Sequence, residues 1–139
     1  MTLFVDASAL VRRYARDRHR SLVLATMEAE GDWCASALCR TETQIALHRL
    51  AISPRQQAEL WRELRDDWEA FTVVPVDDRC LARAADLGAE FGVPAVDAVH
   101  LAAADRLPRP LRYLTFDGRQ LPGALALGMD VVSPLAERP

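Results

Sequence analysis

Short apolar runs alternate with longer segments of helical periodicity along the chain, and this alternation most restricts the possible fold. The first run, Leu3 to Val5, stops at Asp6, and a helical spacing of apolar residues follows it at once. Runs this short and this apolar are typical of strands buried on both faces. Strands that alternate with helices form βαβ units with parallel strands. The sequence therefore predicts one α/β domain over residues 1–139, with a mostly parallel central sheet of about five strands flanked by helices.

The pattern also predicts where the elements lie. Strands are expected at residues 3–5, 33–35, 71–76, 112–116 and 130–133, and helices at 7–17, 21–30, 37–51, 54–70, 79–91, 95–104 and 121–126. Ser53 and Pro54 form a specific helix-start signal, as N-cap and first helical residue. Ser36 is the expected N-cap of the helix at 37–51, whose predicted apolar stripe is Leu38, Ile45, Leu47 and Leu50.

Composition excludes several classes of protein. No apolar run approaches the roughly 18 residues of a membrane span, and no basic region precedes Leu3, so we expect no membrane association, no signal peptide and a cytoplasmic protein. The three cysteines include no C-x-x-C pair, which favours buried reduced thiols over disulfides or structural zinc. The net charge is −3 and all 17 basic residues are Arg. Because a divalent ion bound to acidic ligands would change −3 to −1, this charge is weak evidence against a polyanionic substrate.

Acids recur where predicted strands end. Asp6 follows the first strand and Asp117 follows the strand at 112–116. Ligands of open α/β sheets bind at the carboxyl ends of the strands, so both acids are candidate site residues. The alternative is that Asp6 only caps the next helix. Asp77 and Asp78 also follow a strand and are rival candidates, although a helix-capping role explains them well.

Two further acids lie near the starts of predicted helices. Asp97 lies in an almost wholly apolar segment, and a buried carboxylate costs several kcal/mol unless it is paired or binds a metal. Its alternative role is a first-turn acid that interacts with the helix dipole. His100 shares the face of Asp97 and is expected to be a packed, hydrogen-bonded side chain. Helical spacing places Glu42 in line with Ala46 and Arg49, and its alternative role is an acid near the helix start that interacts with the helix dipole.

These acids point to metal chemistry if they meet at one sheet edge. Converging carboxylates repel one another and raise each other's pKa, whereas Mg²⁺ or Mn²⁺ makes their proximity favourable. Such a site suits metal-assisted hydrolysis of a phosphodiester. Phosphoacceptor receivers and aspartyl-phosphate phosphatases use a Lys, which this chain lacks, and no phosphate-binding glycine motif is present.

Four stretches resemble, in order and spacing, the motifs of PIN-domain proteins, and especially VapC-type toxins of bacterial toxin–antitoxin pairs. They are residues 5–10 (Val-Asp-Ala-Ser-Ala-Leu), Glu42, residues 96–102 (Val-Asp-Ala-Val-His-Leu-Ala) and residues 114–119 (Leu-Thr-Phe-Asp-Gly-Arg). The resemblance extends over essentially the whole chain. It implies a single PIN-like domain with a parallel sheet flanked by helices.

The same resemblance implies a Mg²⁺- or Mn²⁺-dependent endoribonuclease. Its acidic pocket, which supplies the catalytic and metal-binding residues, would consist of Asp6, Glu42, Asp97 and Asp117. Hydroxyl groups at Ser8 and Thr115 would support the pocket. The implied partners are an RNA substrate, a second copy of the chain in a homodimer, and a cognate VapB-type antitoxin whose tail covers the groove.

RNA contacts would rest on arginine, because the chain has no lysine. Arg12, Arg13 and Arg49 are candidate phosphate contacts, with a solvated helix face as the alternative for the first two. A rival hypothesis is a catalytically decayed PIN-fold interaction module that binds through the helix carrying Trp61 and Trp68. A DNA or flap nuclease of the same fold is a third possibility, since nothing in the sequence distinguishes ribose from deoxyribose.

Overall fold

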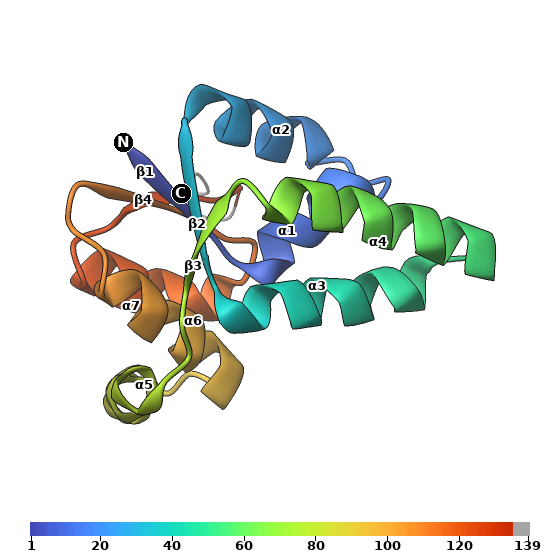
Figure 1. The fold of residues 1–139 in the computed structure, drawn as a ribbon. Coiled ribbons are helices and arrows are strands. Elements are labelled where there is room, and N and C mark those ends of the chain that lie inside the picture. Colours follow the sequence, from blue (N-terminus) through green and yellow to red (C-terminus); the bar gives the residue numbers. More distant parts are fainter. Residues whose placement is uncertain (135–139) are drawn as a thin grey trace.

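The central element is a five-stranded sheet in which every neighbouring pair is parallel, in the order β3-β2-β1-β4-β5 (Figure 1). A computed structural model of the chain describes residues 1–134. The strands are β1 (Thr2–Val5), β2 (Asp32–Ser36), β3 (Phe71–Val74), β4 (Leu111–Leu114) and β5 (Asp130–Val132). The predicted α/β class and parallel five-stranded sheet are confirmed.

Helices connect the strands and cover both faces of the sheet. They are α1 (Ala7–Tyr14), α2 (Arg20–Ala29), α3 (Ala37–Leu50), α4 (Pro54–Trp68), α5 (Asp78–Phe91), α6 (Ala95–Asp105) and α7 (Leu121–Ala126), with a 3₁₀ turn, η1 (Gly118–Gln120), before α7. In Figure 1, α1 to α4 lie on one side of the sheet and α5 to α7 on the other. None of the helices in this part of the chain is long and apolar enough to cross a membrane.

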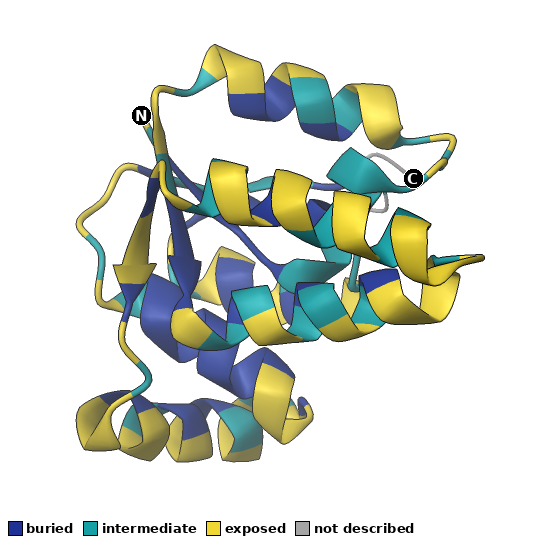
Figure 2. Ribbon diagram, turned by 45° about the vertical axis from the view of Figure 1, so that its right-hand side comes forward, coloured by how far each residue is buried: buried dark blue, intermediate teal, exposed yellow. Residues whose placement is uncertain are grey.

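Alternation along β1 divides the core between the two faces. Leu3 and Val5 pack with the α1–α4 layer, whereas Phe4 packs with the α5–α7 layer and stacks on Tyr113 at 5.3 Å between ring centroids. All three side chains are fully buried, as a strand covered on both faces requires. Helix α6 is buried from Asp97 to Ala104, whereas the outer faces of the other helices are exposed (Figure 2).

The strand order reverses between β1 and β4, which makes this the switch point of the sheet. Val5 lies opposite Leu114, so the two strands end at the same level. The Asp6 amide extends this pairing by donating to the Leu114 carbonyl at 3.3 Å. Ligands bind at such a point in doubly wound sheets, because the connections leave to opposite faces and open a crevice.

The predicted stripe of α3 is partly wrong. Leu47 is buried, but Ile45 and Leu50 are 47% and 56% exposed. The buried line is instead Cys39, Thr43 and Leu47, at a spacing of one turn. Because this line includes a small and a polar residue, hydrophobicity alone did not reveal it. All three cysteines of the chain are buried free thiols, as predicted.

Candidate active site

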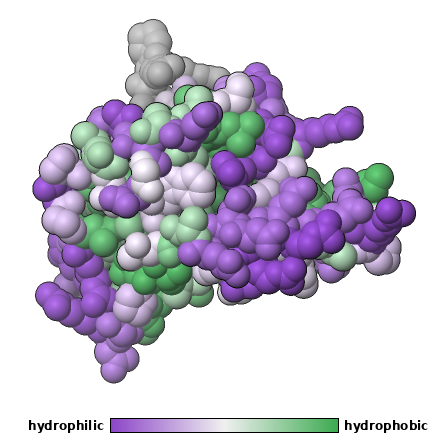
Figure 3. All heavy atoms as spheres, turned by 45° about the horizontal axis from the view of Figure 1, so that its top comes forward, coloured by the Kyte–Doolittle hydropathy of each residue, from purple (hydrophilic) through white to green (hydrophobic). Residues whose placement is uncertain are grey.

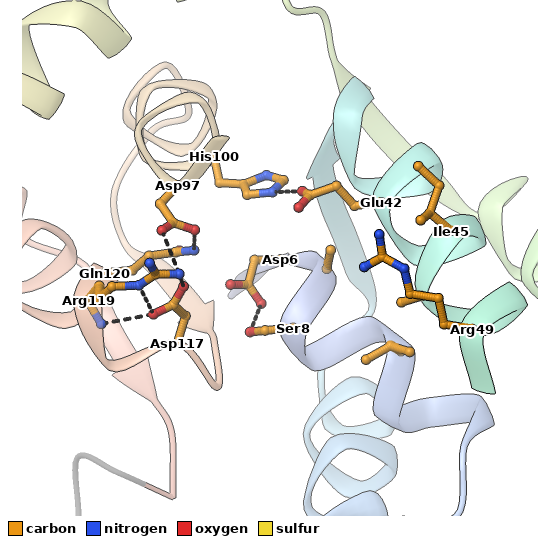
Figure 4. Close-up of a pocket in the computed structure, with 13 residues that line it drawn as sticks. Asp6, Ser8, Glu42, Ile45, Arg49, Asp97, His100, Asp117, Arg119 and Gln120 are labelled. Atoms are coloured by element: carbon orange, nitrogen blue, oxygen red, sulfur yellow. Dashed lines mark hydrogen bonds and ion pairs between the residues drawn. The ribbon is translucent and has the colours of Figure 1, made fainter. Parts of the chain in front are cut away.

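One pocket of about 430 Å³ lies at the switch point and brings the predicted acids together. Asp6 follows β1, Glu42 is on α3, Asp97 is in the first turn of α6, and Asp117 follows β4. All four line the pocket. In Figure 4, Asp97 and Asp117 lie on one side of Asp6, and Glu42 lies on the other.

Asp6 is held by a ring of hydrogen-bond donors. Ser8 Oγ donates to Oδ1 at 2.7 Å and Thr115 Oγ1 donates to Oδ2 at 2.7 Å. The Ala9 amide also donates to Oδ1, at 3.0 Å. Asp6 is therefore both a helix N-cap and a pocket residue, so the two roles suggested by its sequence position are compatible. Burial raises the pKa of the Asp6 carboxyl, although His100 and these hydrogen bonds act in the opposite direction.

The hydroxyls of Ser8 and Thr115 also join Asp6 to the segment that carries Asp117. The Phe116 amide donates to Ser8 Oγ at 2.8 Å, and the Asp117 amide donates to Thr115 Oγ1 at 3.0 Å. The strand end of β4 is thereby fixed against the start of α1. This arrangement gives both hydroxyls a positioning role for the two acids that follow strands.

Asp97 and Asp117 form a second acidic group, bridged by Arg119. Gln120 Nε2 donates to Asp97 Oδ1 at 3.0 Å, while Asp97 Oδ2 is buried and accepts no hydrogen bond from the part of the chain that the structure describes. Burial and the negative charge of Asp117 raise the pKa of Asp97. Burial opposes ionisation of Asp117 too, but hydrogen bonds from Arg119 outweigh it and lower the pKa of Asp117.

Glu42 is oriented by His100, which is only 2% exposed. His100 Nε2 hydrogen-bonds to Glu42 Oε1, and Nδ1 lies 2.9 Å from Ser36 Oγ. Because a carboxylate only accepts, Nε2 must carry the proton. His100 is thus the packed, hydrogen-bonded residue that the sequence suggested. Ser36 stands at the N-cap position as predicted but makes no side-chain cap, since its hydroxyl contacts His100.

The donor set fits a divalent cation. Carboxylate oxygens are preferred by Mg²⁺ and Mn²⁺, and Asp97 Oδ2 is a buried oxygen to which no residue of the described range 1–134 donates a hydrogen bond. Yet within residues 1–134 no three His, Cys, Asp or Glu side chains are close enough to hold an ion as they are placed. Donors from the protein hold the acids instead: hydroxyls at Asp6, Arg119 at Asp117, and His100 at Glu42. Metal binding would have to replace some of these contacts.

Of the three arginines predicted to contact phosphate, Arg49 lines the pocket, whereas Arg12 and Arg13 do not. Arg49 is exposed, and its side chain forms no hydrogen bond or ion pair within residues 1–134. Arg12 Nε lies 3.4 Å from Asp17, and Arg13 Nε lies 2.8 Å from Asp67.

Arg119 and Gln120 are pocket residues to which the sequence analysis assigned no role. Both come from η1, directly behind Asp117. Arg119 is the last residue of the motif at 114–119, but nothing in that motif indicates that its side chain contacts the acids. Gln120 lies just outside the motif, and its closeness to Asp117 in sequence is the signal that could have identified it.

The capping explanation holds for Asp77, the rival strand-end acid. Its Oδ1 accepts from the Cys80 amide at 2.9 Å and pairs with Arg106. It does not line the pocket. The tryptophans of α4 pack internally: Trp61 Nε1 donates to the Gln44 carbonyl, and Trp68 stacks on Phe71 with ring centroids 5.1 Å apart.

Known proteins share this fold and resemble this chain in sequence. A family model described as the PIN domain matches residues 3–121. Ribonuclease VapC46 of Mycobacterium tuberculosis (strain ATCC 25618 / H37Rv) is 31% identical over 133 residues, which are 95% of this chain and 97% of that protein.

Two solved structures illustrate the structural likeness. A toxin–antitoxin complex from Klebsiella pneumoniae contains a chain with a TM-score of 0.69 at 19% identity, covering 96% of this chain and 98% of that one. Mycobacterium tuberculosis VapC20, described as a Sarcin-Ricin loop cleaving toxin, gives a TM-score of 0.67 at 18% identity, covering 84% and 90% of the two chains. Identities this low support the fold alone.

Proposed function

Because this chain belongs to the PIN-domain family, among its VapC-type members, we propose that it is a metal-dependent endoribonuclease and the toxin of a VapBC-type pair. The observation that carries the proposal is the pocket at the switch point, where acids from two strand ends and two helix starts meet. The 31% identity to a protein named as a ribonuclease supports RNA as the substrate.

In this proposal Asp6, Asp97 and Asp117 hold a Mg²⁺ or Mn²⁺ ion, with Glu42 as the fourth acid of the site. A divalent ion would polarise the phosphoryl oxygen and lower the pKa of a water molecule, which is the chemistry of metal-assisted hydrolysis. Ser8 and Thr115 fix the direction of the Asp6 carboxylate through hydrogen bonds of 2.7 Å each. His100 orients Glu42 through Nε2, and the Ser36 hydroxyl in turn contacts Nδ1 of His100.

Arg49 is the arginine best placed to receive the phosphate of the substrate. It shares the pocket wall with Glu42 and Ala46 and is engaged by no other side chain in the described part of the chain. An uncommitted guanidinium can bind phosphate with two parallel hydrogen bonds. Arg12 and Arg13 remain predictions, since each would have to leave Asp17 or Asp67 first.

The test is cleavage of a total-RNA pool by the purified protein with Mg²⁺ or Mn²⁺, and with a chelator. Asp6→Asn and Asp97→Asn should each abolish cleavage while circular dichroism and thermal unfolding show a folded protein. Asp77→Asn is the matched control, because Asp77 also follows a strand and caps a helix but lies outside the pocket. Full activity of Asp97→Asn would end the assignment.

The two alternative functions predict different results for the purified protein. A DNA or flap nuclease would cut single-stranded or branched DNA in preference to RNA. A decayed interaction module would show no strong divalent-metal site by calorimetry. The internal packing of Trp61 and Trp68 leaves these side chains poorly placed to form the binding surface of such a module.

Partners complete the proposal. We expect a homodimer, measurable by light scattering, and a cognate VapB-type antitoxin, recoverable by co-expression with a neighbouring small reading frame. Toxin–antitoxin complexes among the structural relatives support the second expectation. A cytoplasmic location, where RNA and antitoxin are available, belongs to the same proposal.

A further inference from the structure

Arg119 makes close contact with two of the four acids. Its Nε lies 3.1 Å from Asp117 Oδ1 and its Nη2 lies 3.0 Å from Asp117 Oδ2, so the guanidinium covers both oxygens of that carboxylate. The same Nη2 lies 3.4 Å from Asp97 Oδ2. Figure 4 shows Arg119 joined by these contacts to both acids. One positive charge is thus shared by a pair of carboxylates.

When both acids are ionised, a cation between them relieves their repulsion. The side chains of Asp97 and Asp117 are only 12% and 17% exposed, so water screens their repulsion poorly. Within residues 1–134 the hydrogen-bond donor to the Asp97 carboxylate is Gln120, which bonds the other oxygen, Oδ1, whereas Arg119 makes an ion pair with Oδ2. The charge of Arg119 is therefore the compensation that this structure provides for Asp97 Oδ2.

Arg119 can leave these contacts without disturbing the core. Its side chain is 65% exposed and projects from a three-residue 3₁₀ turn. The surface of the molecule is rich in polar side chains, and Figure 3 shows hydrophilic residues over much of one face with smaller apolar patches between them. The exposed position of Arg119 on a short turn is what leaves its side chain free to move.

We propose that Arg119 is a built-in counter-ion that competes with the divalent metal for Asp97 and Asp117. This inference rests on the function proposed above. Mg²⁺ requires carboxylate oxygens at about 2.0–2.1 Å, and the guanidinium covers both oxygens of Asp117. Two cations at the same oxygens also repel each other. Metal binding therefore moves Arg119 away from the acids.

The experiment is calorimetric titration of the full chain with Mn²⁺, together with thermal unfolding in chelator and in saturating Mn²⁺. Arg119→Gln should lower the Kd for Mn²⁺ by about two- to fivefold, the size expected for removing one largely exposed ion pair. Its melting temperature should fall in chelator and rise more than that of the wild type when Mn²⁺ is added. Arg106→Gln is the matched control, since Arg106 forms an ion pair of 2.9 Å with Asp77, outside the pocket.

The outcomes separate this inference from the function on which it rests. If the wild type binds Mn²⁺ and Arg119→Gln binds it equally or more weakly, Arg119 is not a competitor and the inference is wrong. If Arg106→Gln lowers the Kd for Mn²⁺ as much as Arg119→Gln does, the effect comes from the net charge of the protein, and the inference is wrong as well. A wild type that binds no Mn²⁺ would refute the proposed metal site, and this inference with it.

Discussion

Replacing Thr115 with Val tests whether a single hydroxyl supports the centre of the pocket. Thr115 is fully buried, and Val has nearly the same shape without the hydroxyl. The substitution removes the 2.7 Å hydrogen bond to Asp6 Oδ2. A hydrogen bond to a charged group contributes about 1.5–3 kcal/mol. The half-buried Asp117 amide, which donates to the same hydroxyl, can turn to water and adds little.

The expected loss of stability at pH 7 is therefore about 1.5–3 kcal/mol. In a domain of this size it corresponds to a fall in Tm of roughly 5–15 °C. Chemical denaturation gives the free energy directly. Thr43→Val is the matched control, because Thr43 is equally buried but donates to the Cys39 carbonyl. Loss of that uncharged hydrogen bond should cost only about 0.5–1.5 kcal/mol.

The pH dependence of the Thr115→Val effect gives a second check. The hydrogen bond favours ionised Asp6, whose pKa burial raises above its usual value. Because the substitution raises the pKa of Asp6 further, the destabilisation should be complete above the pKa of the variant. It should shrink as the pH falls from there through the wild-type pKa, since a protonated carboxyl gains less from the Thr115 donor. In an Asp6→Asn background the cost should also shrink. Equal losses in both backgrounds, or from Thr43→Val and Thr115→Val, would refute the reasoning.

Two other outcomes follow from the same contacts. His100→Asn should lower metal-dependent cleavage about 10–100-fold, the usual cost of losing a residue that orients a metal ligand. His100→Gln should retain more activity than His100→Asn, because its longer amide side chain reaches toward Glu42. Equal activities of the two variants would contradict the positioning role of His100. The rate of cleavage should fall as the pH is lowered, and this fall should begin at a higher pH than the titration of an ordinary Asp would give. The reason is that burial raises the pKa of Asp6 and of Asp97, and metal binding requires both carboxyls to be ionised. A rate that stays constant from pH 7 down to the usual Asp range would contradict this prediction.

The sequence by itself determined the fold class and the two acids that follow strands. Apolar runs that end at Asp6 and near Asp117 encode buried parallel strands, and parallel strands present their ends at one edge. The carboxylate of Asp97 is conspicuous in the sequence because its neighbours are almost all apolar. These inferences depend on local patterns of about ten residues, which periodicity and capping rules describe well.

Tertiary structure decided which side chains act on those acids. Thr115 bonds to a carboxylate 109 positions away, and His100 bonds to one 58 positions away. No local rule gives such pairs, because they exist only after the layers have packed. The same limit explains why Ser36 was expected to cap α3 and contacts His100 instead.

Arg119 illustrates both what the sequence determines and what only the tertiary structure decides. The sequence places it two residues behind Asp117, but only the fold brings Asp97 on α6 within 3.4 Å of its guanidinium. Arg13 was expected to contact phosphate, yet packing gives it Asp67 as a partner. The sequence gives the charge of each side chain. Which opposite charge it pairs with depends on which helices and strands pack together around the hydrophobic core. Only the tertiary structure could therefore assign these ion pairs.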